Sequence, residues 1–267
     1  MLILGIDRKK CTNCRSCVPE CVALRFVLDK NTNNVKFHED WGCISCGHCI
    51  AICPEDAILR EEMDGQTIEF KEIQNIGSII PFENLHQLLR CKRSIRQYKK
   101  EIVPKEMLNH VLDSMKYAPT GVNIRTLKCT LLSGKEKIQQ LSNDITEKIF
   151  EDPNVSESNK WVMKTKSEMG IDPIFHKAPH VIILHSPELE LVNATIAITY
   201  GMLAAESMGL GTCWIGWAQD PLNTFVNIRK DILGFTDYVS GVFTIGFPRV
   251  KYKRCPTRPK LNTNWLN

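Results

Sequence analysis

The spacing of hydrophobic and polar residues predicts alternating helices and strands over the C-terminal part of this 267-residue chain. Helical periodicity marks residues 83–91, 104–117, 135–150 and 189–208, and Pro104 suits the first turn of the second segment. Short apolar runs predict strands at residues 127–132, 180–185, 212–217 and 238–245, with another helix starting near Pro221. Helices and strands in this order predict an α+β domain.

Two segments depart from this pattern. Residues 151–178 are polar and contain Pro153 and Pro173, so we expect an insertion or lid there and not part of the core. Residues 189–208 are apolar on more than one face of the predicted helix, and a helix that is apolar all round is buried on every side. In a domain of this size, that favours burial against a second subunit.

The N-terminal part has a different organisation. Two cysteine runs begin 32 residues apart, and a short β-prone stretch follows each. Residues 71–82, with Gly77 and Pro81 as breakers, are the expected connector. Residues 1–80 hold 9 Lys and Arg against 12 Asp and Glu, whereas residues 81–267 hold 25 against 18. We therefore predict an acidic domain at residues 1–75 and a basic one at residues 83–267.

Eight of the twelve cysteines repeat one spacing, C-x2-C-x2-C-x3-C, at Cys11, Cys14, Cys17 and Cys21 and again at Cys43, Cys46, Cys49 and Cys53. Disulfides would require an oxidising compartment, and the N-terminus shows no signal peptide. Structural zinc uses two C-x2-C pairs separated by a longer loop, so a third cysteine at the same interval is redundant. The spacing resembles that of two-cluster bacterial ferredoxins, in which the fourth cysteine of each run binds the other cluster.

This resemblance implies two 4Fe–4S clusters with crosswise ligands. One would be bound by Cys11, Cys14, Cys17 and Cys53, and the other by Cys43, Cys46, Cys49 and Cys21. The other four cysteines, Cys91, Cys129, Cys213 and Cys255, have no metal-ligand spacing, and we expect them in the core. Cys91 and Cys255 do lie among basic residues, which lower the pKa of a thiol. The histidines form no metal-binding pattern, so no separate metal site is expected.

Basic residues gather at both ends of the C-terminal domain, in residues 90–100 and 249–260. For either stretch alone, a solvated surface is the simple alternative, and the interleaved aromatic residues of a nucleic-acid platform are missing. Arg93-Ser94-x-Arg96 combines a hydroxyl with two guanidinium groups, a combination suited to a phosphate monoester.

Four motifs of this domain resemble, in order, those of the FMN-dependent nitroreductase family. They are residues 92–98 (K-R-S-I-R-Q-Y, against R-R-S-x-R-x-F/Y), 118–123 (A-P-T-G-V-N, against A-P-S/T-x-x-N), 208–212 (M-G-L-G-T, against G-L-G-S/T) and 246–259 (against G-Y/F-P followed by R-x-P). With the cysteine repeat, the chain resembles the ferredoxin–nitroreductase fusions of anaerobes. The resemblance implies a small two-cluster ferredoxin-like domain followed by a three-layer α-β-α domain with a mixed sheet.

The same resemblance implies a homodimer with FMN at the subunit interface. The phosphate would be held by Arg93, Ser94 and Arg258, assisted by Lys92 and Arg254, and Arg96 would lie near the pyrimidine edge. Pro119, Thr120 and Asn123 would approach the FMN from the other subunit, and the backbone N–H groups near Gly216 and Trp217 would face the flavin N5. Arg125-Thr126-Leu127 replaces the family's usual Q-P-W, so the contacts expected there, and the substrate, stay open.

We therefore predict a cytoplasmic iron–sulfur flavoprotein oxidoreductase. Single electrons would pass from two 4Fe–4S clusters to FMN, for the two-electron reduction of a small electron-poor nitroaromatic, quinone or enone. No catalytic side chain is expected, because the flavin carries the chemistry. One alternative oxidises NAD(P)H and passes electrons out through the clusters to a carrier such as a ferredoxin or flavodoxin; another is a non-enzymatic electron carrier. No membrane partner is expected, because no apolar run is long enough to span a bilayer.

Overall fold

The computed structural model describes residues 2–39, 42–61, 67–68 and 76–266, and the chain forms two compact units. Unit 1 comprises residues 1–76 with the loop Thr120–Arg125, and unit 2 comprises Gly77–Pro119 with Thr126–Asn267. The grouping of this loop with unit 1 differs from the domain ranges expected from the sequence. Residues 71–75 of the expected connector lie outside the described residues, and Ile76–Ser78 form a short 3-10 helix, η1.

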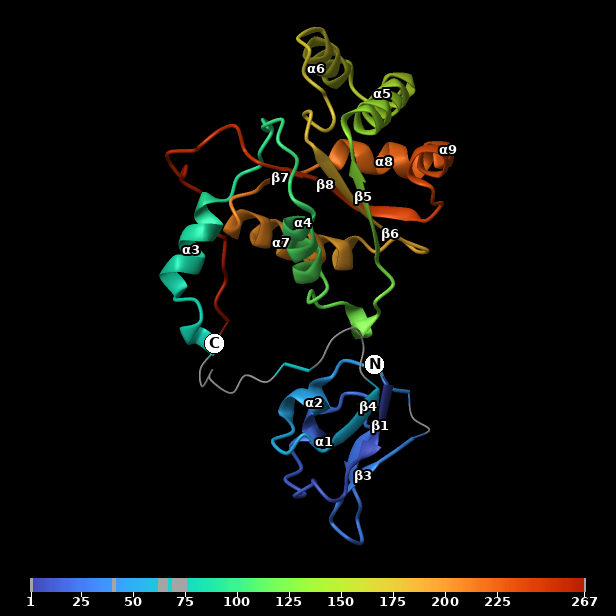
Figure 1. The fold of residues 1–267 in the computed structure, drawn as a ribbon, viewed down its shortest axis with the longest axis vertical. Coiled ribbons are helices and arrows are strands. Elements are labelled where there is room, and N and C mark those ends of the chain that lie inside the picture. The colour runs from blue at the N-terminus through green and yellow to red at the C-terminus, as the bar shows by residue number, and fades with distance from the viewer. Residues whose placement is uncertain (1, 40–41, 62–66, 69–75, 267) are drawn as a thin grey trace. The chain divides into compact units, whose positions relative to one another are not determined.

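Unit 1 is built from two small antiparallel strand pairs and two short helices (Figure 1). The pairs are β1 (Leu2–Ile6) with β4 (Ile58–Glu61), and β2 (Phe26–Leu28) with β3 (Val35–Phe37); the helices are α1 (Cys17–Glu20) and α2 (His48–Ile52). β2 and β4 are the β-prone stretches predicted after each cysteine run. Ile3, Phe26, Val35, Cys49 and Ile58 form the core, and several other cysteines pack against it.

A four-stranded sheet organises unit 2, in the order β5-β6-β8-β7. The strands are β5 (Lys128–Ser133), β6 (His180–Ser186), β7 (Gly211–Trp214) and β8 (Tyr238–Gly246), and each neighbouring pair is antiparallel. Among the described residues, the parallel component of this sheet is an isolated bridge between Ser94 and Thr212 at the β7 edge. The mixed character expected from the family resemblance is therefore confined to that edge.

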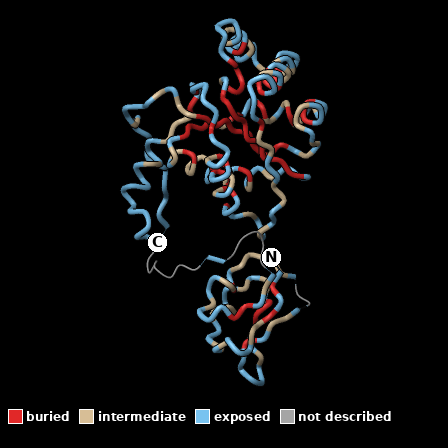
Figure 2. The backbone as a smooth tube through the Cα atoms, in the orientation of Figure 1, coloured by how far each residue is buried: buried red, intermediate tan, exposed pale blue. Residues whose placement is uncertain are grey.

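Helices cover both faces of this sheet, because the central strand β6 is apolar and buried on both sides. Val181 and Ile183 pack on one face with α5 (Lys135–Glu151) and α8 (Gly216–Thr224), whereas Ile182 and Leu184 pack on the other with α4 (Lys105–Met115) and α7 (Leu191–Ser207). Figure 1 shows these two helical layers, and Figure 2 shows the buried residues of unit 2 gathered along the sheet between them. The described residues of unit 2 thus form an α+β, three-layer α-β-α domain.

Two sequence predictions need correction. Residues 151–178 are not an insertion outside the core: they contain α6 (Glu157–Glu168), and Met163, Ile174 and Phe175 are buried in the main core cluster. The helix expected to begin near Pro221 begins at Gly216, so the strand expected over 212–217 ends at Trp214. The remaining short helices are α3 (Phe82–Cys91), η2 (Gly121–Asn123), α9 (Val226–Ile228) and η3 (Arg229–Leu233).

α7 is covered on one face only within a single chain. Ala194, Ala197, Ile198, Gly201 and Ala205 are buried, and a Cβ atom on Gly201 would lie 2.7 Å from the side chain of Met115, so the glycine permits close packing against α4. The opposite face carries exposed apolar side chains. Among the described residues, no helix combines the length and hydropathy needed to cross a membrane.

Candidate cofactor sites

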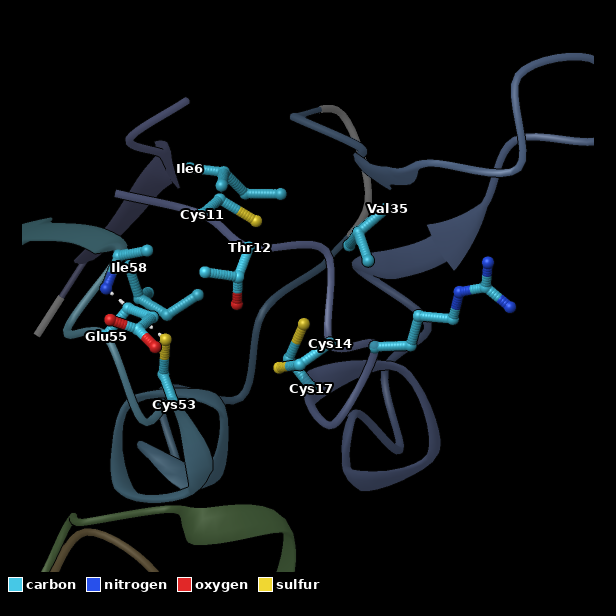
Figure 3. Close-up of a pocket in the computed structure, with 11 residues that line it drawn as sticks. Ile6, Cys11, Thr12, Cys14, Cys17, Val35, Cys53, Glu55 and Ile58 are labelled. Atoms are coloured by element: carbon cyan, nitrogen blue, oxygen red, sulfur yellow. Dashed lines mark hydrogen bonds between the residues drawn. The ribbon is translucent and has the colours of Figure 1, made fainter. Parts of the chain in front are cut away.

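Four cysteine thiols of unit 1 surround one cavity, although they come from both cysteine runs (Figure 3). They are Cys11, Cys14, Cys17 and Cys53, which is one of the two ligand sets expected from the sequence. Their sulfur atoms point toward a common space in Figure 3, and Cys53 reaches it from the C-terminal end of α2. Ile6, Val35 and Ile58 form apolar walls around the thiols.

A second cavity has the complementary lining. Cys21, Cys43, Cys46 and Cys49 surround it, together with Ile3 and Phe26 of the core and with Arg25. The four thiols again come from both runs, and they form the other expected set. In the described part of the chain, no three His, Cys, Asp or Glu side chains are placed so as to hold a single metal ion. The thiols instead surround two separate spaces.

The surroundings of two of these thiols disfavour a free thiolate. Burial and the neighbouring cysteines raise the pKa of Cys17 to about 11 and the pKa of Cys49 to about 12. Thiols in such surroundings are neutral near pH 7, and metal coordination deprotonates a thiol outright. Backbone N–H groups also point at the sulfurs: Ser45 donates to Cys43 Sγ at 3.3 Å. Both cavities therefore suit iron–sulfur clusters.

The segment from Lys92 to Lys99 lies along the β7 edge of the unit 2 sheet. The backbone N–H of Ile95 donates to the Thr212 carbonyl at 2.9 Å, and Lys99 N–H donates to the Phe247 carbonyl at 2.9 Å. Gly211 permits this crossing, because a Cβ atom there would lie 2.5 Å from the side chain of Ile95. Three of the four family-like motifs, at residues 92–98, 208–212 and 246–248, therefore meet at one sheet edge.

Lys92 is a half-buried cation within this edge. Its ammonium group donates to the carbonyls of Arg93 at 3.0 Å and Thr212 at 3.4 Å, and it lies 4.0 Å from the Glu206 carboxylate. Burial lowers the pKa of Lys92 and raises the pKa of Glu206. In the described part of the chain, Thr212 Oγ1 and Glu206 Oε2 are buried without a hydrogen-bond partner. Buried polar atoms of this kind favour a polar ligand beside them.

Arg93 joins the two basic stretches of the sequence. Its guanidinium donates to the Lys92 carbonyl at 2.6 Å and to Cys255 Sγ at 3.1 Å, and the backbone N–H of Arg249 donates to the Gln97 carbonyl at 2.9 Å. The hydrogen bond from Arg93 lowers the pKa of the Cys255 thiol. The expected phosphate ligands Arg254 and Arg258 are exposed in the adjoining C-terminal segment, and Arg96 is exposed as well. A phosphate group fits this cationic edge.

The other expected FMN contacts lie on two further segments. Pro119 is exposed, Thr120 Oγ1 is buried without a hydrogen-bond partner among the described residues, and Asn123 belongs to unit 1, where its amide donates to the Ile44 carbonyl at 2.8 Å. Gly216 and Trp217 form the first turn of α8, where the backbone N–H groups have no intrahelical acceptors. The loop Thr120–Arg125 is grouped with unit 1 and the start of α8 with unit 2, so these two segments do not meet within one unit.

A cavity of about 500 Å³ opens beside the start of α8. Trp217 and Phe225 provide aromatic walls, Val155 lies on the segment after α5, and Asp152 and Asp220 supply carboxylates. The cavity is large enough for a small aromatic molecule. The segment expected to be an insertion thus contributes its first residues to a cavity that also contains Gly216.

Glu206 of the phosphate edge was not predicted, whereas Cys255 was noted among basic residues but expected in the core. Glu206 is the only charged residue of α7, and a single charge in an apolar helix signals a buried pair. Cys255 was expected in the core, but it is partly exposed and bonded to Arg93; Cys91 and Cys129 are exposed, and of these four cysteines only Cys213 is buried. The basic residues around Cys255 did predict a lowered pKa for its thiol.

Comparison with known proteins gives two family matches. Residues 89–247 match the model of the nitroreductase family, and residues 10–58 match that of the 4Fe-4S dicluster domain. A relative from Bacillus subtilis (strain 168), described as an NAD(P)H FMN reductase, is 25% identical over 187 residues, which cover 64% of this chain and 69% of that protein.

Solved structures share the fold of unit 2. A nitroreductase with bound FMN from Bacteroides fragilis NCTC 9343 is 20% identical with a TM-score of 0.58, covering 68% of this chain and 97% of its own. A nitroreductase with bound FMN from Desulfitobacterium hafniense DCB-2 is 18% identical with a TM-score of 0.57, with the same two coverages.

Proposed function

The chain belongs to the nitroreductase family and carries a 4Fe–4S dicluster domain, so it is an FMN-dependent oxidoreductase with iron–sulfur clusters, and we propose that the clusters supply the electrons with which it reduces a small electron-poor molecule. The observation that carries the proposal is the pair of four-cysteine cavities in unit 1, in the same chain as the cationic edge of unit 2. When bound, FMN takes up electrons singly and releases them in pairs, which couples one-electron clusters to a two-electron reduction.

Within unit 2, we assign the FMN phosphate to the edge formed by Lys92, Arg93 and Ser94, with Arg254 and Arg258 from the C-terminal segment. Arg93 has five N–H donors and Lys92 has three, so each retains donors beyond its contacts with the neighbouring backbone carbonyls. Arg96 supplies a cation near the flavin ring, and the backbone N–H groups of the first turn of α8 orient the ring.

The enzyme acts as a homodimer in this proposal. The exposed face of α7 carries Val192, which is 72% exposed, and Tyr200, and α3 exposes Phe82 and Leu89. Apolar side chains on two helices of one unit favour a covering partner, and a second copy would also bring Pro119, Thr120 and Asn123 to the cofactor. The proposed location is the cytoplasm, whose reducing conditions keep thiols available for cluster binding.

The cavity of about 500 Å³ beside Trp217 and Phe225 is the proposed place for the electron acceptor. Aromatic walls suit a flat molecule, and the carboxylates of Asp152 and Asp220 disfavour an anionic one. Neutral nitroaromatics, quinones and enones fit both conditions. Anaerobic assays with neutral and carboxylated members of one quinone series test this assignment, since equal rates for both would contradict it.

A second candidate function has the opposite electron flow. The Bacillus subtilis relative is described as an NAD(P)H FMN reductase, which favours a nicotinamide donor at the flavin and electron release through the clusters. Steady-state assays with NADH, NADPH and reduced ferredoxin separate the two directions. The main proposal expects substrate reduction with reduced ferredoxin; reduction of oxidised ferredoxin by NADH or NADPH alone would support the second candidate. The family assignment favours either enzyme over a non-enzymatic electron carrier.

A further inference from the structure

The two halves of unit 1 share one backbone contact at equivalent positions. The N–H of Arg25 donates to Cys21 Sγ at 3.2 Å, and the N–H of Ala57 donates to Cys53 Sγ at 3.3 Å. Each donor lies four residues after the last cysteine of its run. The sequence repeat thus gives both fourth cysteines the same hydrogen bond, which is a contact that tunes the potential of a cluster.

The side chains at these equivalent positions differ in charge. Arg25 is 6% exposed and lines the cavity of Cys21, Cys43, Cys46 and Cys49, with its guanidinium 4.6 Å from the centre of the Phe37 ring. Ala57 is 1% exposed and lines the cavity of Cys11, Cys14, Cys17 and Cys53. The two equivalent positions therefore carry a buried cation beside one cavity and a methyl group beside the other.

Among the described residues, the other charged or titratable side chains that line the two cavities are exposed. Glu20 and His48 line the cavity that contains Cys21, and Arg15 and Glu55 line the cavity that contains Cys53. Arg15 directs its guanidinium at the Asn33 carbonyl, 3.4 Å away. Water and salt screen exposed charges much more than buried ones, so the buried guanidinium dominates the difference between the cavities.

We propose that Arg25 raises the reduction potential of the cluster bound by Cys21, Cys43, Cys46 and Cys49 above that of the other cluster. Reduction adds one electron, and hence one negative charge, to a cluster, and a nearby buried cation stabilises the more negative state. An electron that enters unit 1 then occupies this cluster first. The inference rests on the crosswise ligand sets, but it requires neither FMN nor a particular direction of electron flow.

An anaerobic redox titration of the full chain, reconstituted with iron and sulfide and followed by electron paramagnetic resonance, tests the proposal. The unsubstituted protein should show two separate one-electron steps. Arg25→Met keeps much of the apolar stem but removes the charge. At a fixed ambient potential it should lower the reduced-to-oxidised ratio of the higher-potential cluster on the order of tenfold, which corresponds to a fall in its reduction potential of about 59 mV for one electron. The lower step should not move.

Three further variants complete the design. Arg25→Lys keeps the charge and should keep the higher step near its original position, and Arg25→Gln provides a second neutral side chain should Arg25→Met bind less iron. Arg15→Met removes an exposed cation from the other cavity and should shift neither step appreciably. A single merged step in the unsubstituted protein, or equal shifts for the lysine and neutral variants, would overturn the proposal.

Discussion

Crosswise binding of the clusters makes a sharp prediction about pairs of cysteine substitutions. Cys21 belongs to the first run of the sequence, but it lines the same cavity as Cys43 of the second run. Substituting both with alanine should therefore disable one cluster and leave the other with all four thiols. Substituting Cys11 and Cys21, which lie in one run but line different cavities, should disable both.

The expected magnitude follows from the two thiol sets. The reconstituted protein should bind about 8 iron atoms per chain, the Cys21→Ala/Cys43→Ala variant about 4, and the Cys11→Ala/Cys21→Ala variant close to none. Iron and sulfide analysis, together with the cluster absorbance, gives these values. Circular dichroism of each full-length variant, read for the helices of unit 2, serves as the folding control. If each run instead held its own cluster, the two variants would exchange their iron contents, and that result would refute the crosswise arrangement.

Three other substitutions test the unit 2 interpretation. Arg93→Met should weaken FMN binding about ten- to hundredfold, which is the effect of losing one charge-assisted hydrogen bond. It should also slow alkylation of Cys255 near neutral pH, because Arg93 lowers the pKa of that thiol. An unchanged flavin affinity in a fluorescence titration would count against the phosphate assignment. Asp172→Asn should lower the free energy of unfolding by about 2–4 kcal/mol, because the carboxylate, 3% exposed, accepts hydrogen bonds from the Ser142 hydroxyl and three backbone N–H groups. Urea unfolding measures this change, and a loss below about 1 kcal/mol would contradict the prediction. Burial lowers the pKa of His176 from 6.5 to about 4, so the unfolded chain binds an extra proton below pH 6.5, and folding stability should fall from there toward pH 4. In His176→Asn, whose asparagine tolerates the φ of 57° at this position, the midpoint of urea unfolding should change less between pH 7 and pH 5. An unchanged pH dependence of that midpoint would exclude this role.

The elements with strong periodicity could be predicted from the sequence to within about two residues. α3, α4 and α5 are examples, because a single hydrophobic period extends along each of them, and β6 follows from its continuous apolar run. Residues 151–178 could not, because polar composition conceals a short helix and the buried Ile174 and Phe175. Asp172 explains why a polar segment can enter the core there, since its carboxylate satisfies several buried N–H groups.

The candidate sites were predictable to the extent that their residues lie in local motifs. The resemblance of the cysteine spacing to that of two-cluster ferredoxins implied the two thiol sets, and the 92–98 motif predicted a cationic edge. The bond between Arg93 and Cys255 joins residues 162 positions apart, and the pairing of Lys92 with Glu206 depends on how α7 ends beside β7. Such contacts arise from tertiary packing, which no local pattern in one sequence encodes.

Electron transfer from the clusters to FMN within one chain is the central claim, and anaerobic rapid mixing tests it most directly. The fully loaded protein is mixed with reduced ferredoxin, and the cluster and flavin absorbances are followed separately. The Cys11→Ala/Cys21→Ala variant, loaded with FMN alone, is the matched control. Flavin reduction should follow cluster reduction in the unsubstituted protein and should slow at least tenfold in the variant. Flavin reduction at the same rate in both proteins would contradict the claim.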